Sequence, residues 1–132
     1  MKNLFFYGTL RHIPLLEIVL GRPAADIALT PQGLADHAAL AVAEGPFPCV
    51  VEQPGAVTQG LLVEGLSDTD IARLDFYEGS FAYDLRDVTL QGGQRAQVYF
   101  PTPGVWTTAA PWDLAEWEKD WAALSCFAAR EV

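Results

Sequence analysis

Residues 67–79 read SDTDIARLDFYEG and carry the clearest secondary-structure signal in the chain. Ser67 followed three residues later by Asp70 is typical of a helix start, because each residue can cap the backbone near the other. Gly79 is typical of a helix end, since glycine adopts the left-handed conformation that often follows the last turn. The stretch therefore predicts a helix of about three turns.

Glu78 takes an unusual position on this predicted helix. Ile71, Leu74 and Glu78 are spaced at i, i+3 and i+7, so the three residues share one face. Burial and the negative end of the helix dipole would both raise the pKa of a carboxyl there. Such an acid is a candidate for proton transfer near neutral pH. The alternative is a structural role, in which Glu78 faces solvent or pairs with Arg73 or Arg86.

A second signal lies near the N-terminus, where residues 4–10 read LFFYGTL. Residues 4–7 are typical of a short buried strand, and Gly8 ends it. A helix is then predicted from Pro14 onward, with an apolar face formed by Ile13, Leu16 and Leu20. A strand that ends at glycine and turns toward a helix exposes backbone N–H groups that suit a carboxylate or phosphate. An ordinary strand-to-helix turn explains the same residues.

Taken with two shorter segments, these stretches resemble the γ-glutamylcyclotransferase-like family, in its γ-glutamylamine cyclotransferase branch. The matching pieces are Tyr7–Leu10, Gly45–Pro48, Gln59–Val63 and Leu74–Gly79, with Tyr83 following. The resemblance implies a small α+β domain, built as a closed, mixed β-barrel flanked by helices. Its pocket would lie between the first loop and the glutamate.

The resemblance also implies a reaction that needs no cofactor. The α-amine of a γ-glutamyl compound attacks its own γ-carbonyl, which forms 5-oxoproline and releases an amine, amino acid or peptide. By position Glu78 would be the catalytic acid and base. The loop N–H groups would hold the α-carboxylate, and the implied substrate-binding residues are Tyr7, Gly8, Thr9, Leu10 and Tyr83.

The residue types fit this chemistry without the resemblance. An α-ammonium group titrates at about 7.7–8 and must lose a proton before it can act as a nucleophile. A desolvated glutamate can accept that proton and later donate it to the leaving amine. The nucleophile belongs to the substrate, so the protein mainly folds the substrate into a reactive shape and stabilises the oxyanion.

Two comparisons with the family pattern leave the identity of the substrate open. Many family members have a basic residue directly after the tyrosine, whereas Tyr83 is followed by Asp84 and Leu85, and arginine comes only at position 86. The loop reads Thr-Leu, which resembles the γ-glutamylamine members. Members that act on glutathione or γ-glutamyl amino acids tend toward Ser-Asn.

Composition narrows the class of protein. A chain of 132 residues predicts one domain, and no apolar run approaches the ~20 residues needed to span a membrane. The net charge of −9, from 8 basic and 17 acidic residues, argues against binding to nucleic acid or to an anionic membrane surface. The start does not read as a secretory signal, so a cytoplasmic location is expected.

The same composition predicts no metal site. Cys49 and Cys126 lack metal-ligand spacing and are expected to be buried free thiols. His12 and His37 are too few and too far apart in sequence to suggest a metal centre. No metal cofactor is therefore expected, in line with the cofactor-free reaction that the resemblance implies.

Along the chain, a barrel domain over residues 1–101 is expected, followed by a helical extension over 102–132. Irregular strands are predicted within 27–41, a short strand at 49–51, and a turn at 53–55. A further strand is predicted at 60–63, and a hairpin turns at 91–94. Helices and strands alternate without a βαβ period, which indicates an α+β domain.

The C-terminal extension is rich in tryptophan. Asp113 with Glu116 predicts a helix start, and the apolar stripe that follows consists of Leu114, Trp117, Trp121, Leu124 and Ala128. This helix either packs back on the barrel or presents a partner-binding face, because tryptophan is enriched at interfaces.

A second resemblance concerns the two ends of the chain. Residues 4–21 and the C-terminal tail resemble the domain that precedes Nudix hydrolase domains in some bacterial proteins. The chain is then a standalone homologue or one part of a longer protein, with a Nudix domain as a covalent or non-covalent partner. Two functions stay open: cyclisation of a γ-glutamyl compound, and a non-catalytic module that binds a small molecule or docks a partner.

Overall fold

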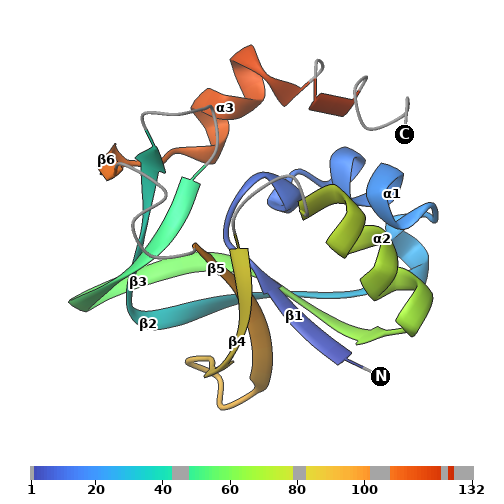
Figure 1. Ribbon diagram of the computed structural model, residues 1–132, viewed down its shortest axis with the longest axis horizontal. Coiled ribbons are helices and arrows are strands. Elements are labelled where there is room, and N and C mark those ends of the chain that lie inside the picture. The colour runs from blue at the N-terminus through green and yellow to red at the C-terminus, as the bar shows by residue number, and fades with distance from the viewer. Residues whose placement is uncertain (1, 43–47, 79–82, 102–107, 123–124, 127–132) are drawn as a thin grey trace.

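The computed structural model describes the backbone over residues 2–42, 48–78, 83–101, 108–122 and 125–126. It describes the side chains over the same residues except 77, 78, 83, 84, 101, 108–110 and 120. The described residues form a six-stranded sheet with helices packed against it (Figure 1).

The sheet contains both parallel and antiparallel pairs. Its order is β4-β5-β1-β3-β2-β6, and β1 runs parallel to β5 while the other neighbours are antiparallel. The strands are β1 (Lys2–Phe6), β2 (Ala28–Val42), β3 (Pro48–Leu66), β4 (Tyr83–Thr89), β5 (Arg95–Pro101) and β6 (Thr108–Pro111). The predicted α+β class with a mixed sheet is confirmed.

β2 and β3 form one long antiparallel pair, whereas the sequence predicted separate shorter strands. The register shifts where Ala35 pairs with Val57 and His37 pairs with Glu52, so residues 53–56 bulge opposite Asp36. Asp36 has φ 62°, and its carboxylate accepts a 3.0 Å hydrogen bond from the N–H of Gly55. The turn signal at 53–55 therefore marks a bulge inside β3, and the strand continues on both sides of it.

The sheet curls until its β4–β5 end reaches β2. The N–H of Gln91, in the turn between β4 and β5, donates a 2.9 Å hydrogen bond to the carbonyl of Gly33 on β2. The rings of His37 and Phe100 also meet across this gap, with centroids 5.5 Å apart. Within the described residues the paired ladder itself ends at β4 and β6, so these contacts, rather than strand pairing, bring the two sides together.

β1 separates two cores because its side chains alternate between the two faces of the sheet. Leu4 and Phe6 belong to the core beneath the helices. Phe5 and Tyr7 belong to a second core, which the curled sheet encloses. The apolar LFFY run therefore reflects a strand buried on both faces.

Two helices cover one face of the sheet and lie against each other (Figure 1). α1 (Ile13–Leu20) has proline in its first turn and ends at Gly21, which has φ 72°. α2 spans Asp68–Glu78. Ser67 and Asp70 cap it reciprocally: the N–H of Ser67 donates to the Asp70 carboxylate at 3.0 Å, and the N–H of Asp70 donates to the Ser67 hydroxyl at 3.2 Å. The predicted helix start is confirmed, while the predicted stop at Gly79 lies outside the described residues.

The C-terminal segment contributes a strand as well as a helix. β6 pairs with β2, which the sequence did not predict, and α3 (Leu114–Asp120) follows. Asp113 caps α3 by accepting a 2.8 Å hydrogen bond from the N–H of Ala115. Trp117 is buried in the helix-side core.

The predicted stripe on this helix is wrong at Trp121, which is 41% exposed. α3 ends at Asp120, and Trp121 has the non-helical backbone angles φ −127° and ψ −17°, so the helical spacing does not carry through it. Ala122 and Cys126 are buried in the helix-side core beyond this point. Leu124 and Ala128, the remaining members of the predicted stripe, lie outside the described residues.

Candidate active site

The first loop leaves β1 at Phe6 and tightens into the short 3₁₀ helix η1 (Thr9–Arg11). The N–H of Arg11 donates to the carbonyl of Gly8, and the N–H of His12 donates to that of Thr9, each at 3.0 Å. Within the part of the chain that the structure describes, no hydrogen bond uses the N–H groups of Gly8, Thr9 or Leu10. These donors are therefore candidates for binding an anionic group.

Gly8 is required here for space. Its φ of −117° lies outside the left-handed region, but a Cβ placed on it would come within 2.9 Å of Cγ of Pro48. Pro48 begins β3 and is buried. Two segments that are 40 residues apart in the sequence therefore pack directly together, and only glycine fits between them.

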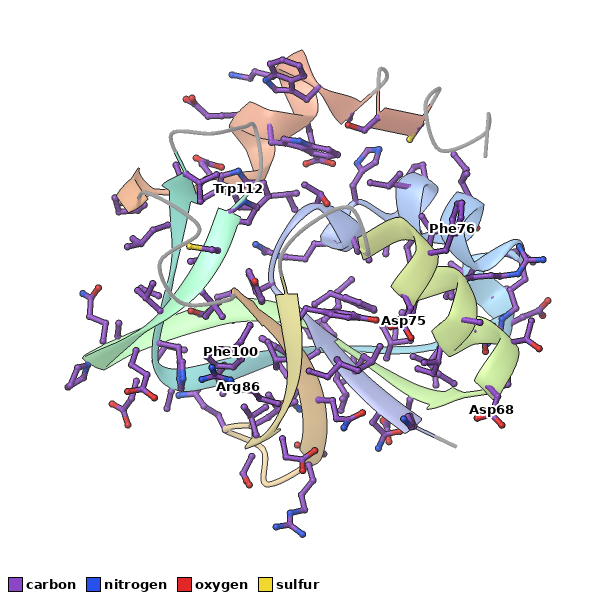
Figure 2. All side chains as sticks on the ribbon, in the orientation of Figure 1. Asp68, Asp75, Phe76, Arg86, Phe100 and Trp112 are labelled. Atoms are coloured by element: carbon purple, nitrogen blue, oxygen red, sulfur yellow. The ribbon has the colours of Figure 1, made fainter. Side chains whose placement is uncertain are left out.

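A pair of tyrosine hydrogen bonds links the loop to α2. The hydroxyl of Tyr7 donates to the backbone carbonyl of Tyr99 on β5 at 2.8 Å. The hydroxyl of Tyr99 donates to Oδ1 of Asp75 on α2 at 2.7 Å. Asp75 lies on the side of α2 that faces the sheet (Figure 2). Because Asp75 is three residues before Glu78, this bond holds the C-terminal half of the helix against β5.

The structure places Glu78 and Tyr83 only by their backbones. Glu78 is the last residue of α2, one helical turn beyond Leu74, which is fully buried. Tyr83 begins β4 and pairs with Pro101 at the end of β5. Their side chains lie outside the described residues, so the catalytic role of Glu78 and the pocket position of Tyr83 stay predictions.

Arg11 was not singled out from the sequence, although a basic residue directly after Tyr-Gly-Thr-Leu was there to be noticed. Its side chain is partly buried at the edge of a groove of about 730 Å³, which runs between η1, α3 and the β2–β3 pair. Burial lowers the pKa of the Arg11 guanidinium, and the carboxylates of Glu118 and Asp113 oppose that shift. The group still carries its positive charge at neutral pH.

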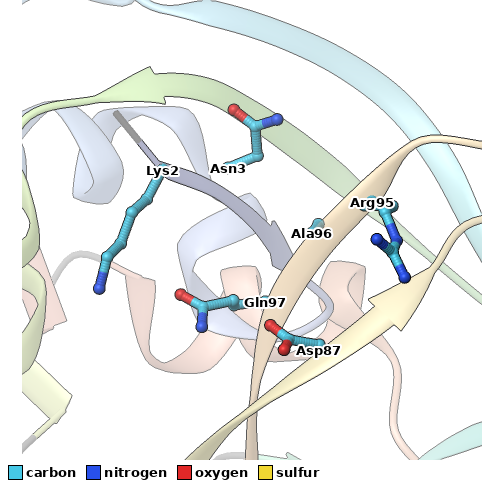
Figure 3. A pocket seen from close by; sticks show the side chains of 6 residues that line it. All are labelled: Lys2, Asn3, Asp87, Arg95, Ala96 and Gln97. Carbon is cyan, nitrogen blue, oxygen red and sulfur yellow. The ribbon is translucent and has the colours of Figure 1, made fainter.

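A second pocket, of about 350 Å³, lies beside the start of β1 (Figure 3). Lys2 and Arg95 supply positive charge there, and Asp87 supplies negative charge. The buried Oε1 of Gln97 has no hydrogen-bond partner within the described residues. This pocket is at the opposite end of β1 from the Gly8 loop, so it is separate from the candidate active site.

Three further observations concern metal binding, membrane crossing and the cysteines. In the described residues, no three His, Cys, Asp or Glu side chains are grouped so that they could hold a metal ion. None of the described helices has the length and apolar character that a membrane crossing demands. Cys49 and Cys126 are both buried, as predicted.

Comparison with known proteins identifies the family. The model of the family described as gamma-glutamyl cyclotransferase, AIG2-like, matches residues 4–122. The chain belongs to this family. The match includes the first loop, the Gly8–Pro48 contact, α2 and most of the C-terminal segment. Among proteins with curated functions, none is similar enough in sequence to count as a match.

Solved structures agree on the fold. A solution structure of an Arabidopsis thaliana protein aligns with a TM-score of 0.70 and 18% identity, over 89% of this chain and 80% of the other. An uncharacterized human protein aligns at 0.65 and 16% identity, over 99% and 87% of the two chains. A structure named gamma-glutamyl cyclotransferase aligns at 0.63 and 17%, over 99% and 87%. At these identities the similarity supports the fold alone.

Proposed function

We propose that this protein is a cytoplasmic, cofactor-free enzyme that cyclises a γ-glutamyl compound to 5-oxoproline and releases an amine or amino acid. The observation that carries the proposal is the first loop, where the N–H groups of Gly8, Thr9 and Leu10 are available to a carboxylate. Membership of the γ-glutamyl cyclotransferase, AIG2-like family supports the same chemistry.

In the proposed reaction the loop holds the substrate's α-carboxylate, which brings the α-nitrogen close to the γ-carbonyl carbon. Glu78 accepts a proton from the α-ammonium group, and the free amine attacks that carbon to form a tetrahedral oxyanion. As the C–N bond to the leaving group breaks, Glu78 donates this proton to the leaving nitrogen. Glu78 then takes the second proton from the ring nitrogen and passes it to the released amine, which departs as an ammonium ion. Atoms and charge balance without a metal or a redox partner.

The test is release of 5-oxoproline from three substrate classes: γ-glutamyl amines, γ-glutamyl amino acids and glutathione. The proposal is supported if the protein releases 5-oxoproline from any of these classes and the Glu78→Gln variant does not. If none of the three classes yields 5-oxoproline, the proposal is wrong.

A non-catalytic docking role is the second candidate, and two exposed aromatic side chains favour it. Phe76 on α2 is 71% exposed, and Trp121 after α3 is 41% exposed. Both are large apolar groups of the kind that anchors protein interfaces. A Nudix hydrolase domain is the partner expected from the sequence. Binding of such a domain that is lost in Phe76→Ala or Trp121→Ala, with no 5-oxoproline release, would favour docking over catalysis.

A further inference from the structure

The groove beside the first loop contains a cation, Arg11, that no described side chain neutralises by direct contact. Arg11 is the last residue of η1, so it follows directly after the loop N–H groups and also lines the groove. Within the described residues its guanidinium forms neither a hydrogen bond nor an ion pair. A partly buried guanidinium offers several N–H donors, and leaving them unpaired is unfavourable.

The two nearby carboxylates are already engaged elsewhere. Glu118 Oε2 lies 2.5 Å from Nδ1 of His12, and the Asp113 carboxylate caps α3. Both attract Arg11 through space, but neither forms an ion pair with it. The guanidinium therefore remains available to an incoming anion.

Apolar side chains form part of the groove lining, together with the carboxylates of Asp113 and Glu118 and the polar side chains of Thr58 and Gln59. Trp112 and Leu114 line the groove together with Ala38 and Ala39 on β2. Trp112 is held in place by two contacts. Its backbone N–H donates to the carbonyl of Ala39 at 3.1 Å, and its ring packs against that of Trp117, with centroids 6.5 Å apart. Figure 2 shows Trp112 between α3 and the β2–β3 pair. A ligand that fits this groove combines an anionic group with an apolar body.

We propose that Arg11 binds the carboxylate of the leaving amino acid, so that the preferred substrates are γ-glutamyl amino acids with apolar side chains rather than γ-glutamyl amines. This inference rests on the proposed cyclisation. Such a substrate carries one carboxylate at each end. The N–H groups of Gly8, Thr9 and Leu10 take the first, Arg11 takes the second, and the apolar side chain lies against Trp112.

The test compares two substrates that differ only in the second carboxylate: γ-glutamyl-leucine and γ-glutamyl-3-methylbutylamine. We expect kcat/KM of the parent to favour the leucine compound by on the order of 10- to 100-fold, the range of a hydrogen bond to a charged group. Arg11→Gln should bring the ratio close to one by lowering the value for the leucine compound. Arg11→Lys should restore part of the preference, because it restores the charge.

Arg95→Gln is the matched control, because it removes an arginine from the separate pocket at the other end of β1. This control should leave the ratio as in the parent. If Arg11→Gln also leaves the ratio unchanged, or lowers both values equally, Arg11 does not read the leaving group and the inference is wrong.

A binding measurement separates this inference from the proposed function. In ¹H–¹⁵N spectra of the parent, N-acetyl-leucine should shift the Arg11 Nε–H and Trp112 indole signals, while N-acetyl-3-methylbutylamine should not. If no substrate is cyclised but these shifts occur, the proposed function fails and the carboxylate site stands. If neither compound shifts these signals, the carboxylate site is overturned whatever the enzyme assay shows.

Discussion

At the scale of single residues, the first loop depends on a contact that no local pattern contains. The sequence identifies Gly8 as the end of a strand, which is correct, since β1 ends at Phe6. The sequence does not show why glycine is needed at this position. The reason is that Pro48 packs where a Cβ on residue 8 would lie. The groove beside Arg11 is likewise absent from the local pattern, because residues from β2, β3 and α3 form most of its lining.

Gly8→Val should abolish cyclisation, and Thr9→Ala should lower it only slightly. Valine would collide with Pro48 and displace the loop N–H groups, whereas alanine at position 9 leaves the backbone donors in place. Kinetics of 5-oxoproline release on both variants measure the difference. An equal loss in the two variants would show that the Thr9 hydroxyl, and not the backbone, does the binding.

Glu78→Gln should remove cyclisation almost entirely and should stabilise the fold at high pH. Position 78 follows the buried Leu74 by one turn at the C-terminus of α2, so we expect a folded-state pKa above the unfolded value of about 4.3. The folded state then holds its proton more tightly, and stability falls as pH rises from the unfolded pKa through the folded one.

Glutamine keeps the shape and removes the ionisation. At pH 8 the Glu78→Gln variant should therefore melt no lower than the parent, and any advantage should shrink toward pH 4. Melting curves at both pH values, together with the 5-oxoproline assay, check the two parts separately. A variant that stays active shows that Glu78 is not the base, and one that unfolds easily at pH 8 shows a structural ion pair instead.

At the scale of elements, the predicted helix starts, which have short-range causes, are confirmed, whereas the sequence does not predict features that depend on long-range contacts. The cap at Ser67 and Asp70 depends on residues three apart, and the structure forms it as predicted. β6 has only four residues and exists because β2 lies beside it, so no local pattern indicates it. The bulge opposite Asp36 interrupts the sequence pattern of β2 and β3, so the sequence predicts several short strands where the structure has two long ones.

Tyr99→Phe should loosen the C-terminal half of α2 while leaving its start intact. The change removes the 2.7 Å hydrogen bond to Asp75, at a cost of about 0.5–1.5 kcal/mol. Hydrogen exchange should speed up at the amides of residues 76–78. Ser67→Ala is the matched control, because it removes the cap and should speed exchange in the first turn instead. Unchanged exchange at 76–78 in Tyr99→Phe would mean that other contacts hold this end of the helix.

At the scale of the whole molecule, β1 is the centre around which the two cores form. The run from Leu4 to Tyr7 sends alternate side chains beneath the helices and into the curled sheet, so the prediction of a buried strand there was sound. The curl of the sheet could be predicted only from the family resemblance. It depends on contacts between distant segments, such as the hydrogen bond from Gln91 to Gly33. α3 extends the helix-side core through Trp117, so residues beyond 101 pack in the same core as α1 and α2.

Trp117→Ala should therefore destabilise the whole protein, and Trp121→Ala should have little effect. Trp117 is 4% exposed and meets the His12 ring edge-on at 5.7 Å, so its truncation leaves a cavity that costs about 3–5 kcal/mol. Chemical denaturation followed by circular dichroism should show a single transition at a lower midpoint. Trp121 is the control, since it lies in the same segment but is largely exposed. If Trp117→Ala leaves the midpoint unchanged, α3 is not part of the cooperative fold, and the segment after residue 101 is free to act as a docking element.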